Sequence, residues 1–171
     1  MSLSLYDASV PVFTRGLTVS TLLDKAEAHA AGSGAALSTS VEARLAPDML
    51  TLAGQVQRAS DTAKFGAARL TGTQAPSFAD DETTFDQLRE RCAKTIAYLG
   101  TVAPETFAGS ETRIVTFGGW ANASTLRGDR YLFQFALPTF FDVTTAYDIL
   151  QHEGVPVGKC DYLGRYEGAD A

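Results

Sequence analysis

Residues 146–164 read AYDILQHEGVPVGKCDYLG, so a helix-like run meets two glycines, a proline and a lysine. A phosphate-binding Walker loop requires four residues between its first glycine and a Gly-Lys pair, then Ser or Thr, on a strand-to-helix turn. Here Gly154 and Gly158 enclose three residues, and Cys160 follows Lys159. Glycine accepts the left-handed conformation that ends many helices, and a nearby proline prevents the helix from continuing. The stretch therefore predicts a helix that stops at Gly154 rather than a nucleotide-binding loop.

The helix that ends there is expected to begin at Asp129 and to run to Glu153. Side chains recur at the spacing of a helix-bundle seam at Leu132, Phe135, Thr139, Val143, Ala146 and Leu150. Pro138 lies inside this helix, where proline removes one backbone hydrogen bond and clashes with the carbonyl four residues earlier. We therefore predict a bend at Pro138. The tail should pack back on the bundle through Val155, Val157, Tyr162 and Leu163.

Three further segments have helical periodicity, residues 5–31, 47–71 and 84–100. In the first, Pro11 either lies in the first turn, with Ser9 near the cap, or kinks a helix that begins earlier, at Ser2 or Ser4, and the kink is the favoured alternative. Pro47 is expected to begin the second, because proline presets the backbone of a first helical turn. Thr84 and Gln87 have the spacing of a capping box at the start of the third.

Between the third and fourth helices the hydrophobic period changes. Residues 112–117 and 122–127 are rich in β-branched side chains and flank a glycine-containing turn, which predicts a small hairpin that leans on the helices. Trp120 at its tip is interpreted either as an anchor for a ligand or as cover for the hairpin's own apolar face. The chain, residues 1–171, therefore predicts a single all-α domain, an up-and-down four-helix bundle with a β-hairpin inserted before the last long helix. Residues 32–46 are its longest candidate crossover.

Composition narrows the classes of function. The 171 residues have a formal net charge of −6, with 14 basic residues scattered among 20 acids, which disfavours nucleic acid as a partner. No stretch approaches the roughly 20 apolar residues of a membrane span, and the chain does not open on a basic segment followed by a long apolar core. Two cysteines do not make a disulfide framework. We expect a cytoplasmic protein with no membrane partner.

Three stretches carry a family resemblance: LAPDMLTLAGQVQRASDTAKFGAARLTG at 45–72, SFADDETTFDQLRERCAKTIAYL at 77–99 and ALPTFFDVTTAYDILQHEGVPVGKCDYLG at 136–164. In this order, over almost the whole chain, they resemble an uncharacterised bacterial family of domains of unknown function grouped with the DinB/YfiT-like four-helix bundles. The resemblance implies a bundle of that class that commonly forms homodimers. For the wider superfamily it implies that many members are metalloenzymes with a divalent metal held by three histidines, one on the second helix and two spaced four apart on a later one. Some members are thiol-dependent transferases or isomerases.

This sequence departs from that metal-binding pattern. Its two histidines, His29 and His152, cannot supply three ligands, and no His-x-x-x-His occurs. The second helix offers Gln55, Gln57 and Asp61 where the superfamily has histidine, and relatives often carry histidine at the position of Asp142. The first hypothesis is therefore a small-molecule-binding or partner-binding module without the three-histidine site. The alternative is a divalent-metal-dependent transferase or hydrolase with a remodelled site.

The candidate ligand-binding residues are Asp142, Thr145, His152 and Trp120. The first three follow one stripe of the last helix at three- and four-residue steps. We hypothesise that Asp142 and His152 line a pocket and bind a nickel or zinc ion. The residues that could complete this site are Glu153, Asp61 and Cys160. Alternatively, Asp142 bonds to the backbone or to Thr145, and His152 interacts favourably with the carboxyl end of the helix.

Other polar residues have simpler interpretations. Cys160 lies near a lysine and His152, which can lower a thiol pKa, so a reactive thiol is a further hypothesis. Cys92 on the third helix is expected in the core. The charged run DQLRERCAK, residues 86–94, is expected to be an exposed helix face, and ADDE, residues 79–82, an acidic loop.

Overall fold

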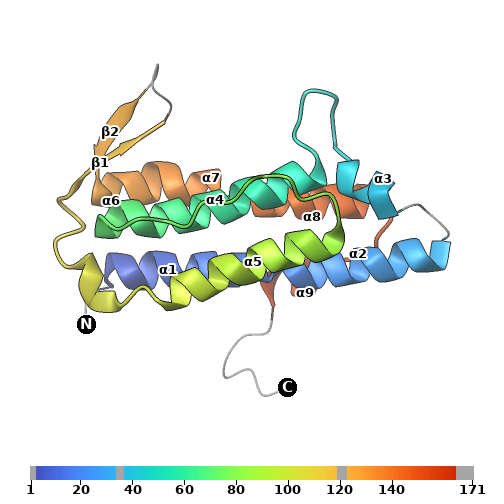
Figure 1. Ribbon diagram of the computed structural model, residues 1–171, viewed down its shortest axis with the longest axis horizontal. Helices are drawn as coiled ribbons and strands as arrows, with labels where there is room; N and C mark the ends of the chain where they lie inside the picture. Colours follow the sequence, from blue (N-terminus) through green and yellow to red (C-terminus); the bar gives the residue numbers. More distant parts are fainter. Residues whose placement is uncertain (1–2, 34–36, 119–122, 165–171) are drawn as a thin grey trace.

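Four long helical rods lie side by side in a computed structural model that describes residues 3–33, 37–118 and 123–164 (Figure 1). The first rod is α1 (Leu5–Gly16), a 3-10 turn (Leu17–Val19) and α2 (Ser20–Ser33); the second is α4 (Leu52–Thr71) and the third is α5 (Phe85–Gly100). The fourth is α6 (Gly128–Tyr131), a π-helical turn (Leu132–Ala136), α7 (Leu137–Thr139) and α8 (Asp142–His152). The shorter elements are α3 (Leu37–Glu42), a 3-10 turn (Pro104–Phe107), the antiparallel strands β1 (Ile114–Phe117) and β2 (Ser124–Arg127), and α9 (Lys159–Leu163). The predicted class, an all-α bundle with a hairpin before the last rod, is confirmed.

Two rods begin with side-chain caps, and the cap of α5 is the capping box predicted at Thr84 and Gln87. The Ser4 hydroxyl accepts the Asp7 amide at 3.1 Å, and the Asp7 carboxylate accepts the Ser4 amide at the same distance. Thr84 and Gln87 form the equivalent reciprocal pair. Such caps satisfy amides that have no partner inside the helix. The first rod therefore starts at Ser4, with Pro11 in the interior of α1.

The second rod begins later than the expected entry at Pro47, and that prediction is wrong. The Met49 amide donates to the Ala46 carbonyl at 3.0 Å, which places Pro47 in a turn. The helix starts after Thr51, whose hydroxyl accepts the Gly54 amide at 3.2 Å. A side-chain cap decides the start here, because a preset proline backbone satisfies no free amide.

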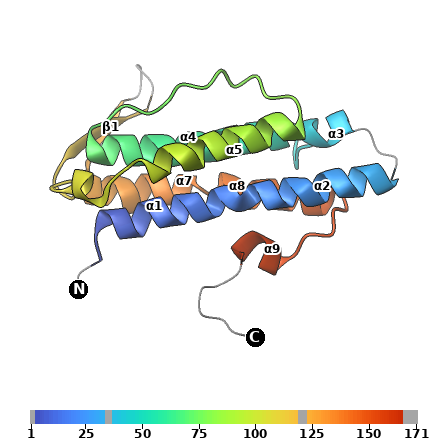
Figure 2. The ribbon, with the colours of Figure 1, turned by 60° about the horizontal axis from the view of Figure 1, so that its bottom comes forward.

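The second and third rods, α4 and α5, run in the same direction, so the chain returns along the bundle between them (Figures 1 and 2). Residues 72–84 make this return. The connection at residues 32–46, which was the predicted crossover, contains the short helix α3. Strict up-and-down alternation is therefore broken between these two rods, and the returning connection carries acidic side chains to the α4–α5 interface.

Small side chains let α4 pack at the centre of the bundle. Its buried face carries the alanines Ala59, Ala63 and Ala67. Gly66 faces the buried ring of Phe13, and a Cβ added there would lie 2.8 Å from Phe13 Cε2. Cys92 is fully buried, as predicted, and burial raises the pKa of its thiol to about 12. Helices long and apolar enough to cross a membrane do not occur in the described ranges.

The fourth rod is interrupted close to Pro138, near the predicted bend. A π-helical turn precedes the proline, and the helix breaks at Phe140 and Phe141 immediately after it. The Phe140 ring packs edge-on against Phe13, with ring centroids 5.2 Å apart, and fills the space beside Gly16. The break therefore lies two residues beyond the proline, where the Phe140 side chain packs on the first rod.

The predicted helix stop at Gly154 is confirmed. Gly154 has φ +81°, its amide donates to the Gln151 carbonyl, and the Val155 amide donates to the Leu150 carbonyl at 3.0 Å. This is the Schellman arrangement, in which glycine avoids the strain of a left-handed backbone. The tail packs back on the bundle, with Val155 buried and the Lys25 ammonium 2.8 Å from the Asp161 carboxylate.

Candidate functional site

A pocket of about 280 Å³ opens between α4 and the fourth rod, and we call it the α4–α8 pocket. Its α4 wall consists of Arg58, Asp61, Thr62, Phe65 and Arg69. These positions fall on one face of a helix, because side chains three and four residues apart are neighbours. The opposite wall consists of Tyr131, Phe135, Thr139 and Asp142, with Gly118 from the end of β1.

Asp142 is the first residue of α8, and it lines the pocket although the residue is only 5% exposed. Within the described ranges, no side chain forms a hydrogen bond or ion pair with its carboxyl group. Burial raises the pKa of Asp142 to about 6, and the positive charge of Arg58 opposes that rise. A carboxyl group with this pKa can accept or release a proton near neutral pH.

Arg69 and Tyr131 form the second polar feature of the pocket. The Arg69 guanidinium donates to the Tyr131 hydroxyl at 3.1 Å. It also lies over the rings of Phe65 and Tyr131, at 5.1 and 5.9 Å from their centroids. These contacts orient the guanidinium without neutralising it, and no carboxylate in the described part of the chain pairs with Arg69. Burial raises the pKa of Tyr131, so the phenol keeps its proton at neutral pH.

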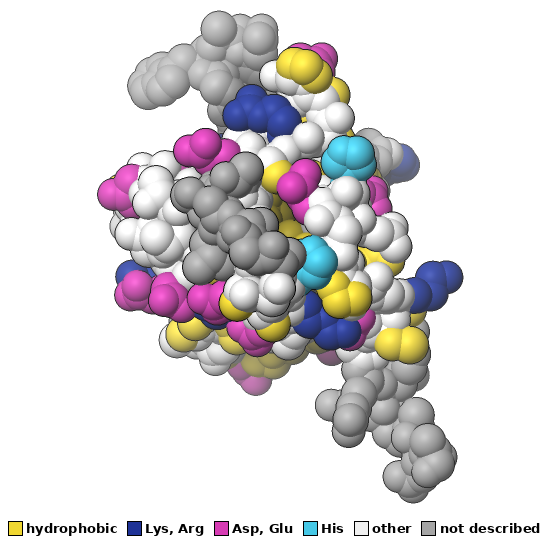
Figure 3. Space-filling model, turned by 90° about the vertical axis from the view of Figure 1, so that its right-hand side faces the viewer, with side chains coloured by type: hydrophobic (Ala, Val, Ile, Leu, Met, Phe, Trp, Pro, Cys, Tyr) yellow, Lys and Arg dark blue, Asp and Glu magenta, His cyan; other side chains and the backbone are white. Residues whose placement is uncertain are grey.

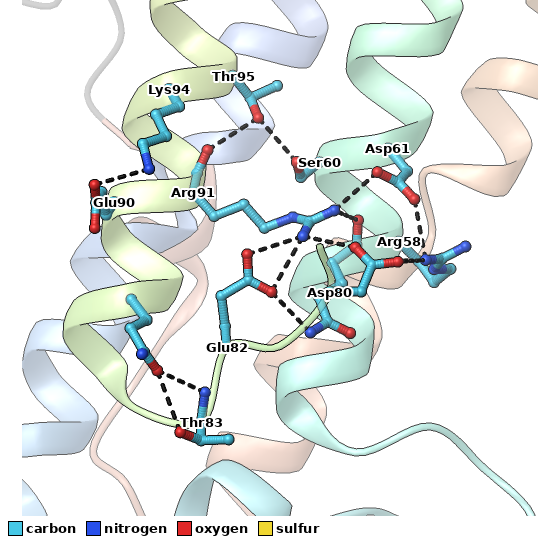
Figure 4. A network of polar contacts seen from close by, with 12 residues as sticks. Arg58, Ser60, Asp61, Asp80, Glu82, Thr83, Glu90, Arg91, Lys94 and Thr95 are labelled. Atoms are coloured by element: carbon cyan, nitrogen blue, oxygen red, sulfur yellow. Dashed lines mark hydrogen bonds and ion pairs between the residues drawn. The ribbon is translucent and has the colours of Figure 1, made fainter. Parts of the chain in front are cut away.

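A buried arginine on α5 joins three acidic side chains beside the pocket (Figure 4). Arg91 is 2% exposed. Its guanidinium lies 2.8 Å from the carboxylate of Asp61 on α4, and 2.7 and 2.9 Å from those of Asp80 and Glu82 on the returning connection. The prediction that residues 86–94 form an exposed charged face is wrong for Arg91, because acids from two other segments surround it.

Two further cations complete this group, which we call the Arg91 cluster: Arg58, Asp61, Lys64, Asp80, Glu82 and Arg91. Lys64 Nζ lies 2.9 Å from Asp61 Oδ1. The Arg58 guanidinium lies 3.0 Å from Asp61 Oδ2 and 2.8 Å from the Asp80 carboxylate. The cluster holds three cations and three carboxylates, so its formal charges balance. Both carboxylate oxygens of Asp61 are thereby occupied by cations of the protein.

The structure brings only some of the predicted site residues together. Asp142 and Asp61 line the same pocket. His152 lies at the other end of α8, ten residues further on and therefore about 15 Å away along the helix axis, too far to share one ion with Asp142. Thr145 is buried, and its hydroxyl donates to the Phe141 carbonyl at 3.3 Å rather than to Asp142.

The remaining candidates do not reach the pocket either. His152 is exposed in the last turn of α8, and Figure 3 shows the chain's histidine side chains on that end of the molecule. Glu153 and Cys160 are also exposed, and neither lines the pocket. Trp120 lies outside the described residues.

Sequence reasoning missed several pocket residues, among them Arg58, Arg69 and Tyr131. A signal for the first two was present, because they share one face of α4 with Asp61 and Thr62, beside the alanine face. Tyr131 had no such signal, since its position at the end of α6 is indistinguishable from that of a core aromatic.

The donors of the pocket do not fit the three-histidine metal site that the resemblance implies. Of its two carboxylates, Asp61 is occupied by cations and only Asp142 is left to bind a ligand. Arg58, on the α4 wall, adds a positive charge to the pocket. Among the described residues, no group of three His, Cys, Asp or Glu could hold a metal ion. Zinc sites use three or four protein ligands, so one free carboxylate is a poor match.

Comparisons with known proteins show what the chain as a whole is similar to. Residues 5–163 match the family model described as domain of unknown function DUF1993. Among solved structures, the chain is similar to the crystal structure of a DinB family member protein from Shewanella denitrificans. The two are 41% identical with a TM-score of 0.89, and the match covers 95% of this chain and 93% of that chain. The search of curated proteins found no match.

Proposed function

This chain belongs to the DUF1993 family of domains of unknown function, and from that premise we propose that it binds a small organic molecule in its α4–α8 pocket. The observation that supports the proposal is the carboxyl group of buried Asp142, which has no partner among the described side chains. Burying an ionised group costs on the order of several kcal/mol unless it gains a partner, and groups of this kind gather at functional sites. A ligand that donates a hydrogen bond or a positive charge to Asp142 supplies that partner.

The other walls of the pocket suit an organic ligand. Flat apolar surfaces come from Phe65, Tyr131 and Phe135. Thr62 and Thr139 add hydroxyl groups. The volume of about 280 Å³ lies just below the common range of roughly 300–1,000 Å³ for small-molecule sites, so the ligand should be the size of a small metabolite.

The alternative proposal is a divalent-metal-dependent transferase or hydrolase that uses Asp142 as an oxygen ligand. It is the weaker of the two, because the pocket supplies a single free carboxylate beside Arg58. Incubation with excess nickel or zinc, followed by dialysis and metal analysis, separates the two proposals. One ion retained per chain, and lost in Asp142→Asn, would favour the metal.

We also propose a homodimer and a cytoplasmic location, which rest on the family resemblance and the composition. Multi-angle light scattering tests the dimer directly, since a mass near that of a single 18.2 kDa chain contradicts it.

A fragment screen tests the proposed function. Two-dimensional NMR of the isotope-labelled protein with a library of small polar fragments should show binders whose shift changes surround the α4–α8 pocket. Asp142→Asn keeps the size of the side chain and removes its charge, so it should weaken these binders about tenfold or more. Asp148→Asn is the matched control, because Asp148 is exposed on the same helix. Fragments that bind elsewhere, or equally well to Asp142→Asn, would contradict the proposal.

A further inference from the structure

The charges around the Asp142 end of the pocket are balanced without Asp142. Arg58 is the pocket cation at this end, and it already contacts Asp61 and Asp80. The whole Arg91 cluster pairs three cations with three carboxylates. When Asp142 is ionised, it therefore adds to the pocket a negative charge that no cation of the cluster balances. The residue is only 5% exposed.

Arg69 leaves the opposite imbalance. Its contacts are the neutral hydroxyl of Tyr131 and the faces of two aromatic rings. Because no carboxylate of the described chain reaches it, Arg69 is one positive charge in excess, held in a fixed orientation. A guanidinium oriented in this way is suited to a planar carboxylate or to a phosphate.

These two charges lie toward opposite ends of the pocket. Arg58 and Arg69 are eleven residues apart on α4, which corresponds to about 16 Å along the axis. The fourth rod runs antiparallel to α4 (Figure 1). Its Tyr131 bonds with Arg69, and its Asp142 is the residue whose pKa Arg58 influences. The aromatic rings of Phe65 and Phe135 line the same pocket as both charged side chains.

We infer that the α4–α8 pocket selects a zwitterionic small molecule, which places a cationic amine beside Asp142 and an anionic group beside Arg69, with an apolar spacer between them. This inference rests on the proposed function and adds the chemical class of the ligand. Each charged group of such a ligand pairs with the pocket-lining side chain of opposite charge that has no ion-pair partner in the described part of the chain. A ligand with one charge satisfies only one end.

Isothermal titration with simple synthetic probes tests the inference on the unaltered protein. The zwitterions 6-aminohexanoate, 8-aminooctanoate and 11-aminoundecanoate lengthen the spacer toward the separation of the two charges along the helix axis. The alkylamine and the alkanoate of each chain length, hexylamine and hexanoate for the shortest, carry one of the two charges. An aminoalkylphosphonate of the same length as the best zwitterion replaces its carboxylate with a phosphate-like group. At least one zwitterion should bind about tenfold or more tightly than both single-charge probes, since each charge-assisted contact contributes at about that level. The carboxylate and phosphonate arms decide between the two anionic groups.

Variants then assign each charge to its end of the ligand. In Arg69→Gln the best zwitterion should bind no better than the alkylamine of the same chain length, and in Asp142→Asn no better than the alkanoate of the same chain length. Arg130→Gln and Asp148→Asn, which change exposed residues outside the pocket, should leave the preference intact. Because Arg69 also bonds with buried Tyr131, the melting temperature of each variant is measured alongside, and the probe series on the unaltered protein does not depend on it.

Two outcomes overturn the inference. One is a single-charge probe that binds as tightly as every zwitterion, and the other is the absence of binding by the whole series at millimolar concentration. Neither outcome removes the proposed function, which fails only if the fragment screen finds no Asp142-dependent binder. The two experiments therefore fail separately.

Discussion

The Arg91 guanidinium on α5 lies 2.8 Å from the Asp61 carboxylate on α4, in an interface where Arg91 is almost completely buried. Together, the cations of Arg91, Lys64 and Arg58 contact both carboxylate oxygens of Asp61. Asp61 therefore holds two rods together, and Asp142 is the acid of the pocket that remains available to a ligand.

Arg91→Met should destabilise the fold by about 3–5 kcal/mol, because it leaves buried carboxylates without their cation. The free energy of unfolding in urea measures the effect. Lys94→Met on the same helix is the control, since Lys94 makes an exposed pair with Glu90 and should cost less than about 1 kcal/mol. Equal losses of unfolding free energy in the two variants would show that the buried cluster stabilises the fold no more than an exposed ion pair does.

Asp80 combines two roles that substitution can separate. It pairs with Arg58 and Arg91, and its backbone has φ +58°, a left-handed conformation that asparagine tolerates better than alanine. Asp80→Asn removes the charge, whereas Asp80→Ala removes the charge and adds backbone strain. We expect Asp80→Ala to be less stable than Asp80→Asn by about 1 kcal/mol in urea denaturation. Equal stability of the two variants would contradict a role for the backbone.

The stability of the protein should depend on pH through Asp142. The pKa of its side chain rises from 3.8 to about 6 on folding, because of burial, so folded Asp142 keeps a proton that the unfolded chain releases. Its contribution is most favourable below about pH 4 and is lost as the pH rises through 6, at a cost on the order of 2–3 kcal/mol. The charged groups that line the pocket with it are Arg58, Asp61 and Arg69.

Asp142→Asn should therefore raise the free energy of unfolding by about 2 kcal/mol at pH 7.5 and change it little at pH 4. Urea denaturation at both pH values measures this difference. Asp148→Asn, on the exposed side of α8, should change stability by less than about 0.5 kcal/mol at either pH. A gain at pH 4 equal to that at pH 7.5 would mean that the buried charge is not its cause.

Gly66→Ala should destabilise the protein although alanine is the better helix former by about 1 kcal/mol. The new methyl group would lie 2.8 Å from Phe13 Cε2 in the packed core, and overpacking of this kind costs about 1–3 kcal/mol. Gly100→Ala meets no atom within 4 Å at the end of α5 and should be neutral or slightly stabilising. Thermal unfolding of the two variants checks the opposite signs.

Several features of the fold could be predicted from residues close together in the chain. Thr84 and Gln87 cap α5, and Gly154 ends α8. The prediction that a helix begins at Pro47 is wrong, because a proline in a turn and a proline in a first helical turn have the same local sequence pattern. The helix begins instead where Thr51 caps its first amides. Only part of the pocket could be predicted, since the sequence identified Asp142 as a candidate ligand-binding residue and did not identify Arg69.

By itself, the sequence determined the start of α5, the end of α8 and the hairpin before the last rod, because those features depend on partners within a few residues. Only the tertiary structure decided that α4 and α5 run in the same direction, that Arg91 is buried and that Asp142 and Arg69 are left unpaired. A charged side chain is buried or exposed according to the charges that face it. For Arg91 one of those charges, on Asp61, lies 30 positions away, at a distance that no local pattern records.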